Sequence, residues 1–224
     1  MENILFLDFE TDTHGTFFCA TYQISNVFEQ VILNEQLRPL AEEKELRCLA
    51  PDVFIREMLA LSESSTLAAY SEAEINIIRE TLGVGNQNRI DVNYCNMNTA
   101  VKKHINAIPS RRQQFNALPP VVLGANAFQQ RRMRRSLASV ARMFPVRIPA
   151  CYHQGQTAQR FKAALRGLEV NGGNYSRLTP TQKSKATKAL NHNKFDVEVL
   201  PVMFEKIYME NPMHIEQSIG IFRI

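Results

Sequence analysis

The most informative absences in this 224-residue chain concern paired cysteines and long apolar runs. The cysteines lie far apart and form no Cys-x-x-Cys pair; they are Cys19, Cys48, Cys95 and Cys151. That spacing argues against a zinc ribbon or a disulfide framework and fits a reducing cytoplasm. No apolar stretch approaches the ~20 residues that span a bilayer. Residues 1–10 include no basic leader, so we expect no signal peptide, no membrane partner and a soluble, cytoplasmic protein.

Acidic residues are missing from a long central segment. Residues 92–168 hold 13 Lys/Arg and no Asp or Glu, whereas residues 1–91 hold 16 Asp/Glu against 6 Lys/Arg. The net charge of +4 for the whole chain hides this separation. An acidic region followed by a basic one is typical of a protein that holds metal cations in one place and a polyanion in another.

The order of expected strands and helices indicates a mixed α/β sheet. Residues 4–9 form an apolar run typical of a buried strand, and residues 16–22 and 27–33 predict two more strands of an antiparallel meander. Strands at 66–70 and 89–94 then alternate with helices beginning at 51, 71 and 99. Further helices are expected at 127–143, 157–168 and 179–209. We expect one domain over residues 1–224, with a basic helical insertion at about 106–175.

Two carboxylates share one face of the first expected strand. Asp8 and Glu10 lie two residues apart, so their side chains project to the same side. Burying two carboxylates together is unfavourable unless a cation neutralises them. A pair of Mg²⁺ or Mn²⁺ ions would do so and would support attack on a phosphodiester. The alternative is that both residues lie at a strand end and face solvent.

A histidine and an aspartate share one face of the last long helix. His192 and Asp196 are four residues apart, which places them one helical turn from each other. Asp196 could bind a metal, and His192 could accept a proton from an attacking water. The alternative is an ordinary surface pair on an amphipathic helix.

The sequence Asp8-Phe9-Glu10-Thr11 after an apolar first strand, with His192 and Asp196 near the other end of the chain, resembles the first and third motifs of the DEDD exonuclease superfamily. The resemblance implies a ribonuclease H-like fold, an antiparallel meander plus parallel strands flanked by helices. It also implies that carboxylates bind two Mg²⁺ or Mn²⁺ ions and that His192 activates water. Here three residues separate the histidine from the aspartate, the spacing of the tyrosine subgroup, whereas the histidine subgroup has four. Asp196 is therefore the firmer assignment.

The superfamily requires a middle acidic ligand, usually an aspartate. Glu74, in the first turn of the helix after strand 66–70, is the best candidate, followed by Glu72 and then by Asp91 on the next strand. Glu74 could equally be the acid of a capping box that begins at Ser71. The predicted catalytic set is thus Asp8, Glu10, Glu74, Asp196 and His192, and the four carboxylates are the predicted metal ligands.

The basic segment is expected to bind the phosphates of a nucleic acid without reading its sequence. Its candidate residues are Lys102, Lys103, Arg111, Arg112, Arg131, Arg132, Arg134 and Arg135. Together with the resemblance, they predict a metal-dependent nuclease, most simply a 3′–5′ exonuclease acting on a single-stranded DNA or RNA end. A catalytically inactive nucleic-acid-binding module and a structure-specific endonuclease are the alternatives. The sequence does not define the oligomeric state.

Overall fold

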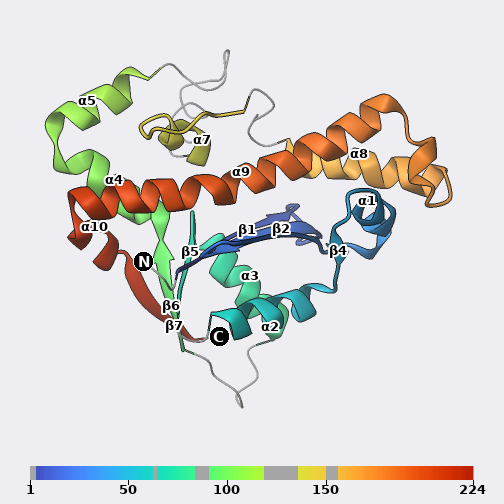
Figure 1. Cartoon of the computed structure of the whole chain (residues 1–224), viewed down its shortest axis with the longest axis horizontal. Helices are drawn as coiled ribbons and strands as arrows, with labels where there is room; N and C mark the ends of the chain where they lie inside the picture. The colour runs from blue at the N-terminus through green and yellow to red at the C-terminus, as the bar shows by residue number, and fades with distance from the viewer. Residues whose placement is uncertain (1–3, 63–64, 84–90, 119–135, 150–155, 224) are drawn as a thin grey trace.

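The computed structural model describes residues 4–62, 65–83, 91–118, 136–149 and 156–223. Within these ranges the chain forms a mixed sheet of seven strands in the order β4-β3-β2-β1-β5-β6-β7 (Figure 1). The strands are β1 (Ile4–Thr11), β2 (Phe17–Ile24), β3 (Val27–Ile32), β4 (Arg47–Cys48), β5 (Thr66–Ala69), β6 (Asp91–Asn96) and β7 (Ile219–Arg223).

Strands β1, β2 and β3 form the expected antiparallel meander. Strand β5 then pairs in parallel with β1, and β6 pairs in parallel with β5. The short β4 pairs in parallel with β3 at one edge, and β7 pairs antiparallel to β6 at the other. This α/β arrangement of a meander plus parallel strands, flanked by helices, is consistent with a ribonuclease H-like fold and confirms the expected fold class.

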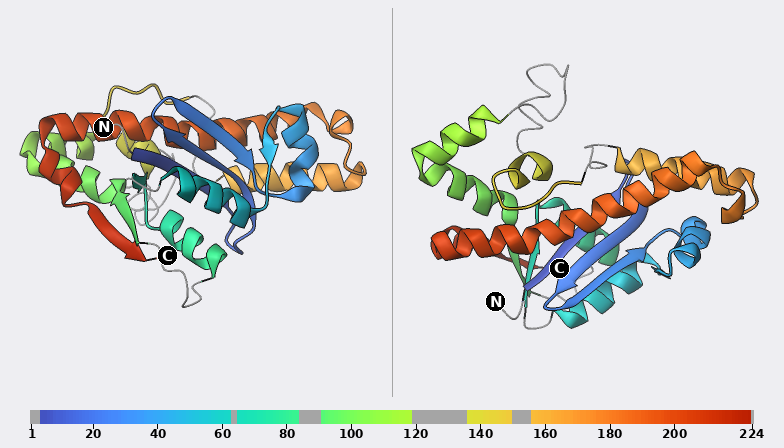
Figure 2. Two further views of the ribbon diagram at one scale, coloured as in Figure 1. Left: turned by 60° about the horizontal axis from the view of Figure 1, so that its bottom comes forward. Right: turned by 45° about the horizontal axis from the view of Figure 1, so that its top comes forward.

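Each face of the sheet is covered by different helices (Figures 1 and 2). On one face, Leu5, Leu7 and Phe9 pack with the buried residues of α2 (Pro51–Leu61) and α3 (Ala73–Leu82). On the other face, Phe6 packs with α4 (Met97–Ala107) and α9 (Pro180–Glu210). Because side chains alternate along a strand, Asp8 and Glu10 project to the same face as Phe6, toward α9.

Helix α9 is the longest element and passes across β1 and β2 (Figure 2). It begins with a capping box, in which Thr179 and Gln182 bond each other's backbone amides, and Pro201 lies within it. Helix α8 (Thr157–Val170) packs along its first half, and the Phe18 and Phe161 rings stack at 5.3 Å between β2 and α8. These contacts fix the position of α9 over the end of β1.

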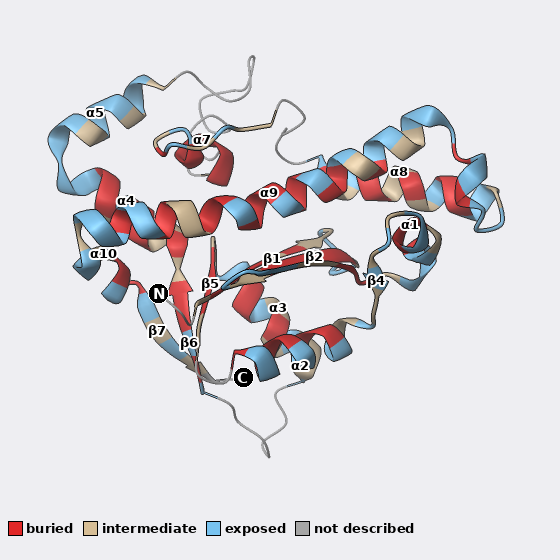
Figure 3. Cartoon of the chain, in the orientation of Figure 1, coloured by how far each residue is buried: buried red, intermediate tan, exposed pale blue. Residues whose placement is uncertain are grey.

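The remaining elements are short and lie around this core. They are η1 (Glu35–Leu37), α1 (Arg38–Glu43), α5 (Pro109–Ala117), α7 (Leu137–Ala141), η2 (Tyr175–Arg177) and α10 (Pro212–Glu216). Burial is concentrated on the sheet and on the helix faces turned toward it, whereas α5 has no buried residue (Figure 3). Of the basic helix expected at 127–143, only Leu137–Ala141 is helical in the described part, and residues 127–135 lie outside it. No helix in the described ranges is long and apolar enough to cross a membrane.

Candidate metal centre

The acidic residues of β1 and the predicted site residues of α9 meet at one pocket. Helix α9 presents His192 and Asp196, both buried, with His192 Nε2 3.4 Å from Asp196 Oδ2. Glu10 joins them: one ligand atom from each of the three residues lies within 4.8 Å of the other two. The pocket, about 290 Å³ in volume, is lined by Asp8, Phe9, Glu10, Thr11, Thr157, Ala158, His192 and Asp196. Residues from opposite ends of the chain therefore converge.

The electrostatics of this pocket favour a cation. Burial raises the pKa of Asp8 well above its usual range, and the nearby charges of Asp196 and Glu10 raise it further. Burial and then the charge of Asp196 likewise raise the pKa of Glu10, against a hydrogen bond from Thr157 that lowers it. Among the described residues, no lysine or arginine contributes to the pKa shift of Asp8 or Glu10. The carboxylates of Asp8 and Glu10 thus lie close together in a buried place, a condition that favours a bound cation.

Glu74 is buried at the start of α3 but is not among the residues that line the pocket. Burial raises its pKa to about 7, and its charge in turn raises the pKa values of Asp8 and Glu10. Ser71 Oγ donates a hydrogen bond of 3.0 Å to Glu74 Oε2, and the Ala73 amide donates to Ser71 Oγ. Ser71 therefore contacts Glu74, but the expected capping box is not formed: α3 begins at Ala73, its N-cap is Glu72, and the Glu72 side chain makes no capping hydrogen bond.

The other two candidates for the middle carboxylate are less well placed. The exposed Glu72 accepts a 3.4 Å hydrogen bond from Asn96 Nδ2. Asp91 lies toward the opposite end of the sheet from Asp8. Leu5 pairs with Leu67, and Leu67 pairs with Tyr94, all in parallel strands. Asp8 follows Leu5 in β1, whereas Asp91 precedes Tyr94 in β6. At ~3.3 Å per residue this separates them by about 20 Å along the strands. Asp91 is thus excluded.

Three residues at the site are not indicated by any motif. The buried Asn193 donates 2.6 Å from Nδ2 to Asp8 Oδ2, and Thr157 bonds the Glu10 side chain. Tyr70 lies at the end of β5, where burial and the charge of Asp196 raise its pKa. The only sequence signal for Asn193 is its position next to His192, and Thr157 and Tyr70 have none.

The predicted nucleic-acid-binding residues fall into three groups. Lys102 and Arg112 are exposed on α4 and α5. Lys103 Nζ donates 2.8 Å to the Gln217 carbonyl, and Arg111 forms an ion pair with Glu210, so these two have partners within the protein. The remaining four lie outside the described residues: Arg131, Arg132, Arg134 and Arg135.

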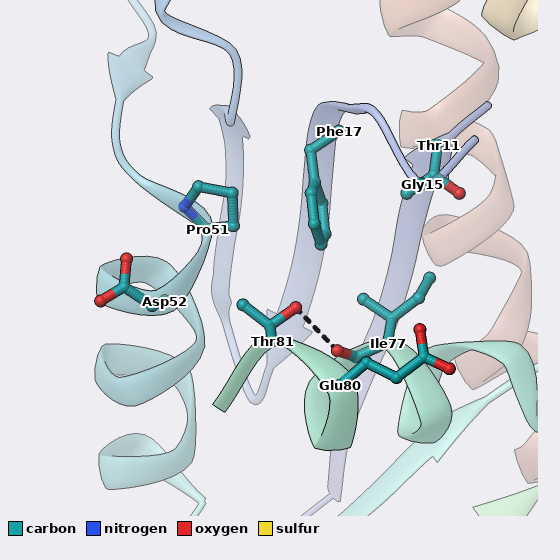
Figure 4. A pocket seen from close by; sticks show the side chains of 8 residues that line it. All are labelled: Thr11, Gly15, Phe17, Pro51, Asp52, Ile77, Glu80 and Thr81. Carbon is teal, nitrogen blue, oxygen red and sulfur yellow. Dashed lines mark hydrogen bonds between the residues drawn. The ribbon is translucent and has the colours of Figure 1, made fainter. Parts of the chain in front are cut away.

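A second cavity, about 480 Å³ in volume, lies between the β1–β2 turn and helices α2 and α3. Phe17 and Ile77 provide apolar surface, and Asp52 and Glu80 extend from the two helices on either side of it (Figure 4). Thr11 lines both cavities, but this one contains none of the predicted site residues. Its two carboxylates disfavour a phosphate there, so it adds nothing to the candidate site.

Comparison with known proteins yields no match to a protein-family model, a curated protein or a solved structure. Asp8, Glu10, His192 and Asp196 come together in one pocket, and Glu74 lies close enough to affect two of them electrostatically.

Proposed function

We propose that this protein is a metal-dependent nuclease that hydrolyses nucleic-acid phosphodiester bonds, most simply as a 3′–5′ exonuclease. The observation that carries the proposal is the convergence of Glu10, His192 and Asp196, with ligand atoms within 4.8 Å of one another, in the pocket that Asp8 also lines. With Asp8, the order and types of these residues resemble the first and third motifs of the DEDD superfamily, although the spacing from His192 to Asp196 is that of its tyrosine subgroup.

The donor set fits Mg²⁺ or Mn²⁺. Both are hard cations that prefer carboxylate oxygens, and an imidazole nitrogen is acceptable to Mn²⁺. The raised pKa values of Asp8 and Glu10 also support a cation site, because buried carboxylates close together favour a bound cation or a bound proton. When bound, a pair of such ions supplies Lewis-acid stabilisation to the attacking and leaving oxygens of the phosphodiester.

The residues of the chain take distinct roles in this proposal. Asp8, Glu10 and Asp196 hold the ions, and His192 accepts a proton from the attacking water. Thr157 holds the Glu10 carboxylate through its hydrogen bond. Glu74 contributes negative charge from the start of α3, and its bond to Ser71 keeps it in place. Lys102 and Arg112 attract the phosphates of the incoming strand.

The test is degradation of end-labelled single-stranded DNA and RNA with Mg²⁺ or Mn²⁺, compared with EDTA. We expect metal-dependent release of mononucleotides by the wild-type protein and none by Asp8→Ala. Glu198→Gln is the matched control, because Glu198 is an exposed acid on α9, two residues beyond Asp196. Full activity in Asp8→Ala would end this assignment, and discrete fragments in place of mononucleotides would indicate an endonuclease.

One observation favours a second candidate, a nucleic-acid-binding module without catalysis. The Glu74 carboxylate already accepts a hydrogen bond from Ser71 and is not among the pocket-lining residues. That module predicts salt-sensitive binding of single strands and no cleavage with either metal. The same assay, read together with strand binding, separates the two functions.

A further inference from the structure

A buried hydrogen-bond network joins α9 to three neighbouring strands at Asn193. The Asn193 side chain is fully buried, and its Oδ1 accepts hydrogen bonds from Thr21 Oγ1, from Gln30 Nε2 at 3.1 Å and from Cys19 Sγ at 3.4 Å. Gln30 Nε2 also donates 3.0 Å to the Leu190 carbonyl of α9. The network thus ties one turn of α9 to β2 and β3.

These donors determine which way the Asn193 amide faces. Because donors from Thr21 and Gln30 surround Oδ1, the Nδ2 group must point the other way, toward β1. There it donates 2.6 Å to Asp8 Oδ2 and 3.4 Å to the Asp8 carbonyl. A flipped amide would place an oxygen against two acceptors of Asp8 and an NH₂ group against Gln30. The network therefore presents a donor to Asp8.

We propose that Asn193 is the positioning residue of the metal centre, holding the Asp8 carboxylate by its Oδ2 atom and leaving Oδ1 for a cation. The inference rests on the proposed function, because it assigns Asp8 as a metal ligand. Among the described residues, no other side chain hydrogen-bonds to Asp8, so Asn193 alone fixes its orientation. Groups that orient metal ligands in this way usually affect metal affinity about 10–100-fold.

The arrangement also explains how α9 and β1 act together. His192 and Asn193 are adjacent on α9, yet one lines the pocket and the other is buried against the sheet. The same helix turn therefore presents one functional side chain directly and orients a second, Asp8, on the neighbouring strand. Any displacement of α9 would disturb both together.

The test is a calorimetric titration of the metal-free protein with Mn²⁺, carried out on the wild type and a set of variants. Asn193→Leu keeps most of the volume and removes the donor, and we expect it to weaken Mn²⁺ binding by about 10–100-fold. In an Asp8→Ala background the same substitution should change the affinity by less than about threefold, because Asn193 acts through Asp8. Asn171→Leu is the matched control: it removes an asparagine side chain that is bonded to the Gly167 carbonyl, away from the site, and should leave the Mn²⁺ affinity unchanged.

The outcomes separate the two proposals. If the wild-type protein binds Mn²⁺ and Asn193→Leu binds it with the same affinity, the role of Asn193 is overturned and the metal centre stands. An equal loss of affinity from Asn193→Leu in the Asp8→Ala background has the same consequence. Wild-type protein that binds no Mn²⁺ overturns the metal centre and this inference together. If Asn193→Leu does not fold, the wild-type protein gives the answer by NMR. Its Asn193 side-chain amide signal should then shift on Mg²⁺ addition, while that of Asn171, bonded to Gly167 away from the site, stays fixed. An unchanged Asn193 signal in metal-bound protein contradicts the inference.

Discussion

His192 Nε2 lies 3.4 Å from Asp196 Oδ2, one turn further along α9, and both side chains face the acidic end of β1. A single helix therefore carries the proposed proton acceptor and one of the proposed metal ligands. Helix α9 contacts β1, β2 and α8, and these contacts hold it in place. The geometry allows the two roles to be separated experimentally.

We predict that His192→Ala lowers the rate of phosphodiester hydrolysis by about 10²–10⁴-fold, the usual effect of losing a general base. The Mn²⁺ dissociation constant should change by less than about threefold, because the carboxylates remain. Single-turnover rates and Mn²⁺ titration of the same preparation check both parts. A loss of Mn²⁺ affinity of tenfold or more would make His192 a ligand instead of a base.

The buried carboxylates should contribute an inverse dependence of stability on pH in metal-free protein. The pKa of Glu74 is about 7 in the folded chain against an ordinary 4.5, so the folded state keeps a proton that the unfolded state loses between these values. Stability from this group is complete below pH 4.5 and falls as the pH rises to about 7, by on the order of 3 kcal/mol. Asp8 and Glu10 act in the same direction. Thermal melting in EDTA between pH 5 and 8 measures the effect.

Glu74→Gln should remove most of the contribution of Glu74, because the amide oxygen can still accept from Ser71 and carries no charge. Glu72→Gln is the matched control, because Glu72 is exposed and lies two residues before Glu74. It should leave the dependence of stability on pH unchanged. The lowered pKa values of His104, about 4, and of His214 act in the opposite direction, so the test is the difference between the two proteins: identical pH profiles for wild type and Glu74→Gln would contradict the electrostatic account of the site.

Divalent metal should reverse this destabilisation at high pH. Mn²⁺ at 100 times the dissociation constant measured at pH 8 should stabilise the folded chain by about 2.7 kcal/mol at that pH. The same Mn²⁺ concentration should stabilise it less at pH 5, because protons compete for the same carboxylates. Melting curves with and without Mn²⁺ at the two pH values test this. Equal stabilisation at both would place the metal elsewhere.

Two exposed residues of the basic segment should contribute to strand binding. Lys102→Ala with Arg112→Ala is expected to reduce the slope of log binding constant against log salt by about 1.4, at ~0.7 for each lost contact with a single strand. Fluorescence anisotropy with labelled oligonucleotides at several salt concentrations measures it. Arg111→Met should instead lower the free energy of unfolding by about 1 kcal/mol, because Arg111 is paired with Glu210. An unchanged slope in the double variant would exclude both residues.

Local patterns predicted the parts of the fold that depend on contiguous apolar residues. The meander and the long last helix have such patterns, and β1 and α9 lie close to the expected ranges. Strands β4 and β7 could not be predicted, because β4 has two residues and β7 is an edge strand with Ile221 exposed. In α2 the apolar residues alone do not define the buried face, because Val53 and Leu61 are exposed whereas Phe54 is buried against the sheet.

The candidate site shows a similar limit. Asp8, Glu10, His192 and Asp196 could be predicted because short spacings on a strand or a helix determine which side chains share a face. The rejection of Asp91 required the register of β6, which no local pattern contains. Asn193 could not be found either, because its role depends on donors from Thr21 and Gln30, far away in the chain.

The most direct test of the central claim is anomalous diffraction from crystals soaked in Mn²⁺. The account predicts two peaks, about 3.5–4 Å apart, between the carboxylates of Asp8, Glu10 and Asp196. Peaks should disappear in Asp196→Asn crystals grown and soaked in the same way. Wild-type crystals with no peak in this pocket, at a Mn²⁺ concentration that saturates binding in solution, would contradict it.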